Sequence, residues 1–159
     1  MNHGNRRWSV RTGFTLIETM MVLVVLGMIA LIGTPKLSAS LGHARARAAV
    51  NRFVAAHSLA KATAIRYGRR AELWIDAAGG TFWIRQDSTG LGGNVLRITP
   101  AATVGDGVTL ASNRAILCFN GRGLPTTAGA CEAPDATVVI STADRADTLT
   151  ITPLGKILR

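Results

Sequence analysis

The residues best suited to chemistry stand near position 13, at the border of an apolar stretch. Gly13 precedes Phe14, and Glu18 is the only charged residue between positions 14 and 34. A glycine leaves room at a protease site and permits the extended backbone that cleavage needs. A carboxylate within an apolar span is costly unless it has a partner. Cleavage after Gly13 would create that partner, because the new α-amino group of Phe14 is a cation.

The apolar stretch itself predicts a membrane span. Residues 14–34 comprise 21 residues with one charge, which as a helix would extend roughly 32 Å, enough for a bilayer core. The following sequence GTPKLSAS contains no clear signal-peptidase site. The preceding residues 1–13 are polar and basic, with Arg6, Arg7 and Arg11. We therefore expect a short leader over 1–13 and a transmembrane helix over 14–34.

A second helical segment is expected over 35–70. Small and medium apolar residues recur there on one broad face of a helix, so that this face can lie on a sheet. The residues of this face are Ala46, Ala49, Val50, Phe53, Ala56, Ala60, Ala64 and Tyr67. Pro35 stands at the join with the preceding span, where it removes one backbone hydrogen bond and can kink the helix. One long helix over about 14–67 is the simplest arrangement.

The remainder, 71–159, has the pattern of a sheet. Short stretches rich in β-branched residues alternate with glycine-containing turns. The expected strands lie within 71–77, 81–87, 94–99, 114–120, 137–142 and 147–153. The first two are separated by Ala-Gly-Gly and predict a hairpin. The fold class is therefore α+β, with one long N-terminal helix packed on an antiparallel β-sheet domain.

Charge is distributed unevenly along the chain. Eighteen Lys and Arg residues oppose nine Asp and Glu residues, for a net charge of +9. Eight of the cations and none of the acids lie in 36–70, whereas 71–159 is nearly neutral. Arg45, Arg52, Arg66 and Arg70 fall close together on a helical wheel. This face is either solvated or in contact with anionic lipid, or it docks a polyanion or acidic partner subunits.

Two cysteines, Cys118 and Cys131, stand 13 positions apart in the sheet domain. Such a pair suits a disulfide, which would contribute roughly 2–3 kcal/mol and indicate an oxidising compartment. Two unpaired buried thiols are the alternative. With the disulfide formed, the sheet domain would lie outside the cytoplasm.

The sequence RTG-FTLIE at 11–18 resembles the leader of type IV pilins, and Pro35 falls where pilins commonly have a helix-kinking proline. The resemblance implies that a prepilin peptidase cleaves after Gly13 and methylates Phe14. It also implies that Glu18 of one subunit pairs with the Phe14 amine of a neighbour in a filament. The expected partners are other pilins or pseudopilins and the bacterial inner membrane. The resemblance further implies a protein that crosses the inner membrane once, with its C-terminal domain in the periplasm, and that is found in a filament after processing.

Within pilin-like proteins the chain resembles the GspH/FimT family of minor pilins and pseudopilins. The long helix, the strand-rich domain, ILCFNGRGLPTTAGAC at 116–131 and the tail TLTITPLGKILR carry this resemblance. Some FimT-like members bind DNA through a glycine-arginine motif near the C-terminus. Here Lys156 stands where arginine is expected and Arg159 lies one residue late. Lys156, Arg159 and Arg122 are nevertheless candidate contacts for nonspecific DNA binding, unless the tail is simply a last strand ending in solvated charge.

The resemblance leaves three functions open. The first choice is a FimT-like minor pilin of a type IV pilus, with DNA uptake as a candidate activity. The alternatives are a pseudopilin H of the type II secretion system, in its periplasmic pseudopilus, and a membrane-anchored DNA receptor that works without polymerisation.

Catalytic sites are not indicated. The three histidines lie in the leader or on the basic helix, so a Ser-His-Asp site in the sheet domain is excluded. No zinc, P-loop or dinucleotide motif occurs, and no catalytic residue, metal ligand or cofactor is expected. The apolar content of 48% excludes a disordered chain. We expect a protein that acts by assembly, not an enzyme.

Overall fold

The computed structural model describes residues 13–89, 95–127, 131 and 135–159, and for 32–39 and residue 95 the backbone alone. The chain forms two compact units, one ending at Ser38 and the other comprising Ala39–Arg159. Apart from Gly13, the predicted leader lies outside the described residues.

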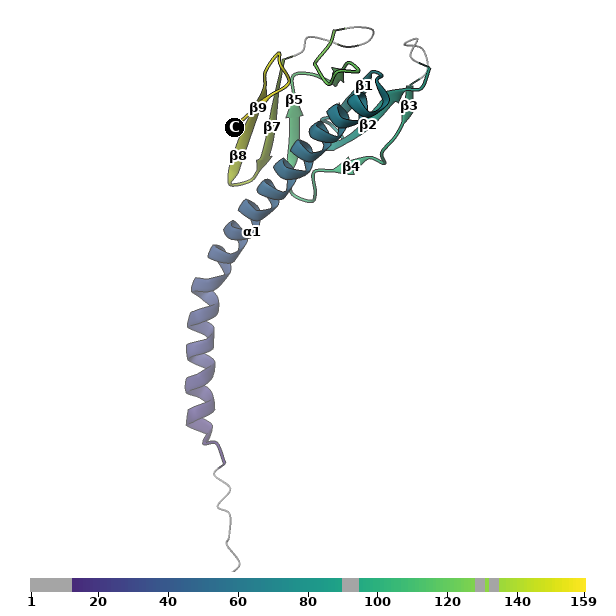
Figure 1. Cartoon of the computed structure of the whole chain (residues 1–159). Coiled ribbons are helices and arrows are strands. Elements are labelled where there is room, and N and C mark those ends of the chain that lie inside the picture. The colour runs from purple at the N-terminus through teal and green to yellow at the C-terminus, as the bar shows by residue number, and fades with distance from the viewer. Residues whose placement is uncertain (1–12, 90–94, 128–130, 132–134) are drawn as a thin grey trace, which may run out of the picture. The chain divides into compact units, whose positions relative to one another are not determined.

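A single helix, α1, runs from Leu16 to Tyr67 and accounts for all the helix in the described chain, as predicted (Figure 1). It ends in a Schellman motif. Gly68 has a φ of 62°, its N–H donates to the Ile65 carbonyl, and the N–H of Arg69 donates to the Ala64 carbonyl. A left-handed residue at this position satisfies the last free carbonyls of a helix and favours glycine. The end of the long helix, predicted at about 67, is confirmed at Tyr67, and Arg70 of the segment 35–70 lies beyond the helix.

No helix in the part of the chain that the structure describes is long and apolar enough to cross a membrane. The last residues of the predicted span 14–34, together with Pro35, fall in 32–39, where side chains lie outside the description. The membrane span and the role of Pro35 stay predictions.

The described residues contain nine strands in two antiparallel sheets, and with α1 they confirm the predicted α+β fold. The first sheet has the order β3-β2-β1-β6, and β4 also pairs with β2; its strands are β1 (Ala71–Asp76), β2 (Thr81–Asp87), β3 (Val95–Arg97), β4 (Ala102–Thr103) and β6 (Ile116–Phe119). The second has the order β5-β7-β8-β9; its strands are β5 (Thr109–Ser112), β7 (Ala136–Thr142), β8 (Arg145–Ile151) and β9 (Ile157–Leu158).

The predicted hairpin is confirmed. Strands β1 and β2 pair with Trp74 opposite Trp83, and the turn between them contains Gly80 with a φ of 58°. The six expected strands are all present within a few residues. Strands β4, β5 and β9, of two to four residues, were not predicted.

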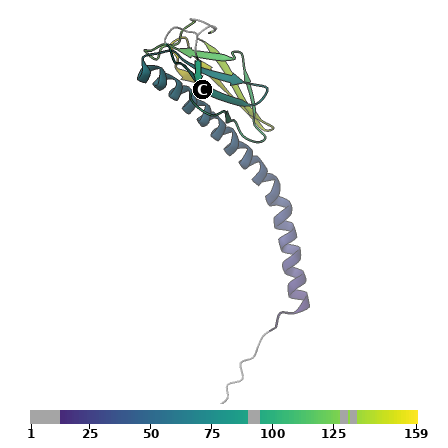
Figure 2. The same ribbon diagram turned by 90° about the vertical axis from the view of Figure 1, so that its right-hand side faces the viewer.

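The core lies between the second half of α1 and both sheets (Figures 1 and 2). Phe53 is fully buried and meets Phe82 of β2 edge-to-face, with ring centroids 5.6 Å apart. Ala49, Ala60 and Ala64 are also fully buried, so the predicted apolar face is largely confirmed. Tyr67 is an exception, being 52% exposed. His57, which the apolar pattern did not include, is buried in the same face.

Candidate functional site

The peptide bond expected to be cleaved lies just outside the helix. Residues 13–15 are not helical, and Phe14 is 79% exposed. Thr15 caps α1, because the N–H of Glu18 donates to its carbonyl at 3.1 Å and to its Oγ1 at 3.3 Å. Thr15 and Glu18 have the Thr-x-x-Glu spacing of a capping box, in which a carboxylate also favours the positive end of the helix dipole. Gly13 and Phe14 are therefore accessible outside the helix, while Glu18 lies in the first helical turn.

An apolar surface follows Glu18 along the first unit. From Leu16 to Leu31 every residue is exposed, and Glu18 is the only charge there. Such a long apolar stripe without an internal partner marks a surface that meets another protein or a membrane. Within this unit the arrangement has no catalytic chemistry, but it can serve assembly.

The cysteine pair is a disulfide. Cys118 on β6 and Cys131 are bonded, and neither cysteine of the chain is free. This confirms the first of the two alternatives. The bond ties the end of the first sheet to the segment that leads to β7.

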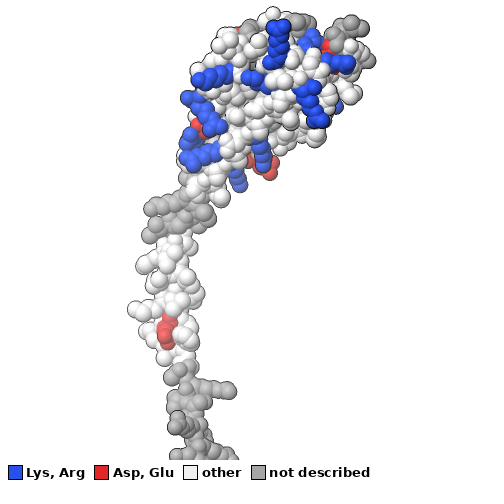
Figure 3. Space-filling view, in the orientation of Figure 1, with Lys and Arg blue, Asp and Glu red and all other residues white. Residues whose placement is uncertain are grey.

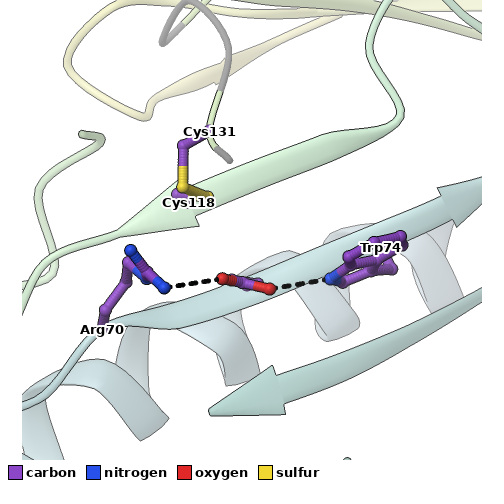
Figure 4. The surroundings of a disulfide bond; sticks show 5 residues. Arg70, Trp74, Cys118 and Cys131 are labelled. Carbon is purple, nitrogen blue, oxygen red and sulfur yellow. Dashed lines mark hydrogen bonds and ion pairs between the residues drawn. A yellow bond between two sulfur atoms is a disulfide. The ribbon is translucent and has the colours of Figure 1, made fainter. Parts of the chain in front are cut away.

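Beneath the disulfide lies a buried polar cluster (Figure 4). Glu72 of β1 is only 3% exposed, and its Oε1 pairs with the Arg70 guanidinium at 3.2 Å. Its Oε2 accepts a hydrogen bond of 2.9 Å from the indole N–H of Trp74. Ligand atoms of Glu72, Cys118 and Cys131 lie within 4.8 Å of one another. Because the two sulfurs are bonded together and both carboxylate oxygens are engaged, this cluster is structural and not a metal site.

An arginine–tryptophan ladder crosses the outer face of the first sheet, and the sequence analysis did not identify it. The rings of Trp74 and Trp83 stack with centroids 6.0 Å apart. Arg85 covers Trp74 at 4.8 Å, and Arg97 covers Trp83 at 5.0 Å. Cation–π contacts of this kind contribute about 0.5–1 kcal/mol each where partly exposed. The alternating residues of 71–87 indicated which side chains share this face, but the pairing register was needed to bring them together.

The predicted basic face of α1 is dispersed. Arg45 and Arg52 reach the loop between β4 and β5, where the Arg52 Nη1 donates to the Thr103 carbonyl at 3.5 Å. Arg66 lies over the ring of its neighbour Tyr67 at 5.4 Å. Arg70 has left the helix and pairs with Glu72. The wheel argument failed because the helix ends at Tyr67 and because two arginines turn toward a loop of the same chain.

The three candidate DNA contacts fall into two groups. Arg122 and Lys156 are exposed, each on a turn. The two turns adjoin, because Gly155, next to Lys156, lies close to Pro125, three residues after Arg122: a Cβ added to Gly155 would come within 2.9 Å of Pro125. Lys61 of α1 donates a hydrogen bond to the Gly155 carbonyl at 3.3 Å, which holds the turn that carries Lys156 against the helix. These two cations share one region.

Arg159 lies elsewhere, beside the helix. Its Nη2 donates to the Asn51 Oδ1 at 3.2 Å. Asn51 and Arg159 line a groove of about 410 Å³ together with Arg47, Arg145 and Asp147. Lys and Arg side chains are spread over the surface of the second unit, with few acids among them on the face shown in Figure 3.

Gly121 and Gly123, on either side of Arg122, are glycines because a larger residue would not fit. A Cβ on Gly121 would lie 2.5 Å from the Gly68 carbonyl oxygen, and one on Gly123 would lie 2.7 Å from the Ile65 Cδ1. The Gly-Arg-Gly turn therefore packs directly on the end of α1, where only hydrogen atoms fit.

His57 is the one buried histidine of the described chain. Its Nε2 has no hydrogen-bond partner there, and its ring meets Phe119 edge-on with centroids 5.1 Å apart. Burial, together with the positive charge of Lys61, lowers the pKa of His57 to about 4. It is neutral at neutral pH and acts as a core residue.

Comparison with known families decides the assignment. Residues 49–155 match the family described as "Type II transport protein GspH", which is more than half of the chain. This chain belongs to the GspH family. Residues 8–34 of this GspH-family protein also match the "Prokaryotic N-terminal methylation motif". A search of curated proteins finds no match.

Solved structures show the same fold. The minor pseudopilin EpsH from the type 2 secretion system of Vibrio cholerae is 16% identical, with a TM-score of 0.57, covering 72% of this chain and 94% of that one. The type IV minor pilin FimU of Pseudomonas aeruginosa is also 16% identical, with a TM-score of 0.53, covering 70% and 85%. The GspH-family protein therefore has a pilin-type α+β fold.

Proposed function

We propose that this protein is a minor pilin-type subunit, a structural protein without enzymatic activity that assembles into a filament through its N-terminal helix. One observation carries the proposal: an accessible Gly13–Phe14 bond stands immediately before a capped helix whose exposed apolar residues surround a single carboxylate, Glu18. The match to the methylation motif and membership of the GspH family support it.

Processing would convert the precursor into the assembling form. A prepilin peptidase cleaves after Gly13 and methylates the new terminus at Phe14. Before assembly the apolar segment 14–34 anchors the protein in the bacterial inner membrane, with the second unit in the periplasm. The disulfide between Cys118 and Cys131 supports an oxidising compartment for that unit. In the filament, Glu18 pairs with the Phe14 amine of a neighbouring subunit.

The test combines a mass measurement with an assembly measurement in the host. Intact mass of the mature protein should show loss of 1–13 and one added methyl group, and a bulky residue in place of Gly13 should block this step. Glu18→Ala should be processed but excluded from sheared filaments, whereas Thr19→Ala, one residue further along the same helix, should enter them. Normal entry of Glu18→Ala into filaments would contradict the pairing of Glu18.

Within this class we favour a FimT-like minor pilin of a type IV pilus that binds DNA nonspecifically. The adjoining turns that carry Arg122 and Lys156 support this, because two exposed cations there can meet one phosphate backbone. Gel-shift assays of a soluble 39–159 fragment with duplex DNA should show binding that falls steeply with salt. Arg122→Gln/Lys156→Gln should weaken it, whereas Arg159→Gln should weaken it less, since Arg159 lies in a separate groove.

A pseudopilin of the type II secretion system is the second candidate, and the fold shared with EpsH supports it. Deleting the gene separates the two: loss of pilus-dependent DNA uptake favours the pilus, and retention of secreted proteins in the periplasm favours secretion. A membrane-anchored DNA receptor is the third. It would retain DNA uptake in the Glu18→Ala variant, which cannot assemble.

A further inference from the structure

A groove between α1 and β8 concentrates positive charge around one carboxylate. Arg47 and Asn51 on the helix form one wall, and Arg145 and Asp147 on β8 form the other. Arg159 closes one side, held by the 3.2 Å hydrogen bond from its Nη2 to the Asn51 Oδ1. The groove has a volume of about 410 Å³ and lies entirely within the second unit.

Only some of the charged side chains in the groove form salt bridges. Arg145 holds Asp147 in a bidentate ion pair, with its Nε 2.9 Å from both carboxylate oxygens and its Nη2 2.6 Å from Oδ1. This hydrogen bonding, assisted by the charges of Arg159 and Arg47, keeps the pKa of Asp147 below its usual range. Arg47 itself makes no hydrogen bond or ion pair with any residue that the structure describes. Arg159 is held only by a neutral amide. Arg47 and Arg159 therefore make no salt bridge with a described residue, and their charges act on Asp147 only at longer range.

The groove also has an apolar part. Its lining includes the exposed Ala146, together with Val50 and Leu149, which are almost completely buried in the core beneath it. A side chain that ends in a carboxylate and has a short aliphatic stem would satisfy both features. Its methylene groups would pack near Ala146, and its oxygens would accept hydrogen bonds from Arg47 and Arg159.

We propose that this groove binds an aspartate or glutamate side chain presented by a neighbouring subunit of the filament, with Arg47 and Arg159 as the binding residues. The proposal rests on the proposed assembly function and names one contact within it. It requires no contribution from Arg122 or Lys156.

Three features favour a protein carboxylate over a nucleic acid. Asp147 lines the groove and repels a phosphate backbone as well as a carboxylate. A single carboxylate side chain can bind at the helix wall, formed by Arg47 and Asn51, and so avoid Asp147. The groove is bounded by one turn of helix, Arg47–Asn51, and one stretch of strand, so it does not offer the row of cations that successive phosphates require. Its apolar part has no counterpart on a phosphodiester backbone.

A titration of the 39–159 fragment tests the binding step, since all buried residues found in the described chain lie within this unit. The probe is the peptide acetyl-Ala-Glu-Ala-amide, followed by NMR at the amides of 145–149, with acetyl-Ala-Gln-Ala-amide as its control. We expect saturable binding of the glutamate peptide alone. In Arg47→Gln/Arg159→Gln it should weaken by about tenfold or more, the loss expected when a charge-assisted hydrogen bond is removed.

The matched control variant is Arg45→Gln/Arg66→Gln, which removes two arginines from α1 outside the groove and should bind the peptide normally. Thermal unfolding must be unchanged in both variants, so that loss of binding cannot reflect loss of fold. Equal binding of inorganic phosphate or of the glutamine peptide would overturn the proposal. Tighter binding of a DNA duplex through Arg47 and Arg159 would overturn it in favour of a nucleic acid.

Assembly of the full chain in the host separates this inference from the function on which it rests. Wild-type protein should enter sheared filaments, and Arg47→Gln/Arg159→Gln should be processed but enter them several-fold less. If wild-type protein does not enter filaments, the proposed function fails. If both proteins enter equally, the proposed function stands and the groove contact is wrong.

Discussion

The two halves of α1 belong to one helix but differ in how far their apolar side chains are buried. From Leu16 to Leu31 its apolar side chains are exposed, whereas from Ala46 to Ala64 a stripe of them is buried against two sheets. Large side chains predominate in the first half, and alanines predominate in the buried stripe of the second. Alanine lets the helix approach the sheets closely, while Leu, Ile, Val and Met supply area for contacts with other molecules. The second half therefore stabilises the folded unit, whereas the exposed first half fits the proposed contacts with other molecules.

The largest expected effect tests this division directly. Phe53→Ala should lower the free energy of unfolding of the 39–159 unit by about 3–5 kcal/mol, because it removes a fully buried ring that meets Phe82. Urea denaturation of the fragment measures this. In the full chain Val24→Ala, in the first half, should leave the unfolding of that unit unchanged and reduce filament entry instead. A comparable loss of stability in Val24→Ala would refute the division.

A smaller effect concerns pH and belongs to the second half alone. His57 has a pKa of about 4 in the folded protein, below the value of about 6.5 in an unfolded chain. Between about pH 4 and about pH 6.5, His57 is therefore protonated in the unfolded state and neutral in the folded state. Stability should fall as pH drops from about 6.5 to 4, by up to about 3 kcal/mol.

Denaturation midpoints of the 39–159 fragment at several pH values measure this loss. His57→Leu is the matched control, because leucine fills a buried site and does not titrate. Its stability should depend less on pH over the same window. An unchanged slope in His57→Leu would mean that another group is responsible.

The smallest effect concerns the start of the first half. Thr15→Ala removes the Oγ1 that accepts a hydrogen bond from the Glu18 N–H, and a lost cap costs about 1 kcal/mol. Hydrogen exchange at the Glu18 amide of the full chain in detergent micelles should become several-fold faster, while exchange in Ala46–Ala64 stays the same. Thr15→Ser keeps the cap and serves as the control. Faster exchange in both segments would show that the two halves are coupled.

Sequence patterns predicted the elements better than the sites. The helix, the β1–β2 hairpin and the cysteine pair follow from local signals: spacing of apolar residues, alternation and turn glycines. Exposure of Tyr67 and burial of His57 depend on what lies opposite each side chain, which the helix pattern does not contain. The arginine groove joins position 47 to positions 145 and 159, and both the pairing of β8 with β9 and the packing of α1 beside β8 were needed to bring them together. Gly13, Phe14 and Glu18 were recognisable because their chemistry is local.

The packing of the helix on both sheets also determines how the second unit responds to force. A pull applied at Ala39 along the axis of the second half of α1 would load the contacts of Phe53, Ala60 and Ala64 together in shear. Contacts loaded in parallel must break at once, unlike hydrogen bonds of a strand peeled away one at a time. The second unit should therefore resist a pull along this axis better than a pull that peels away one edge strand.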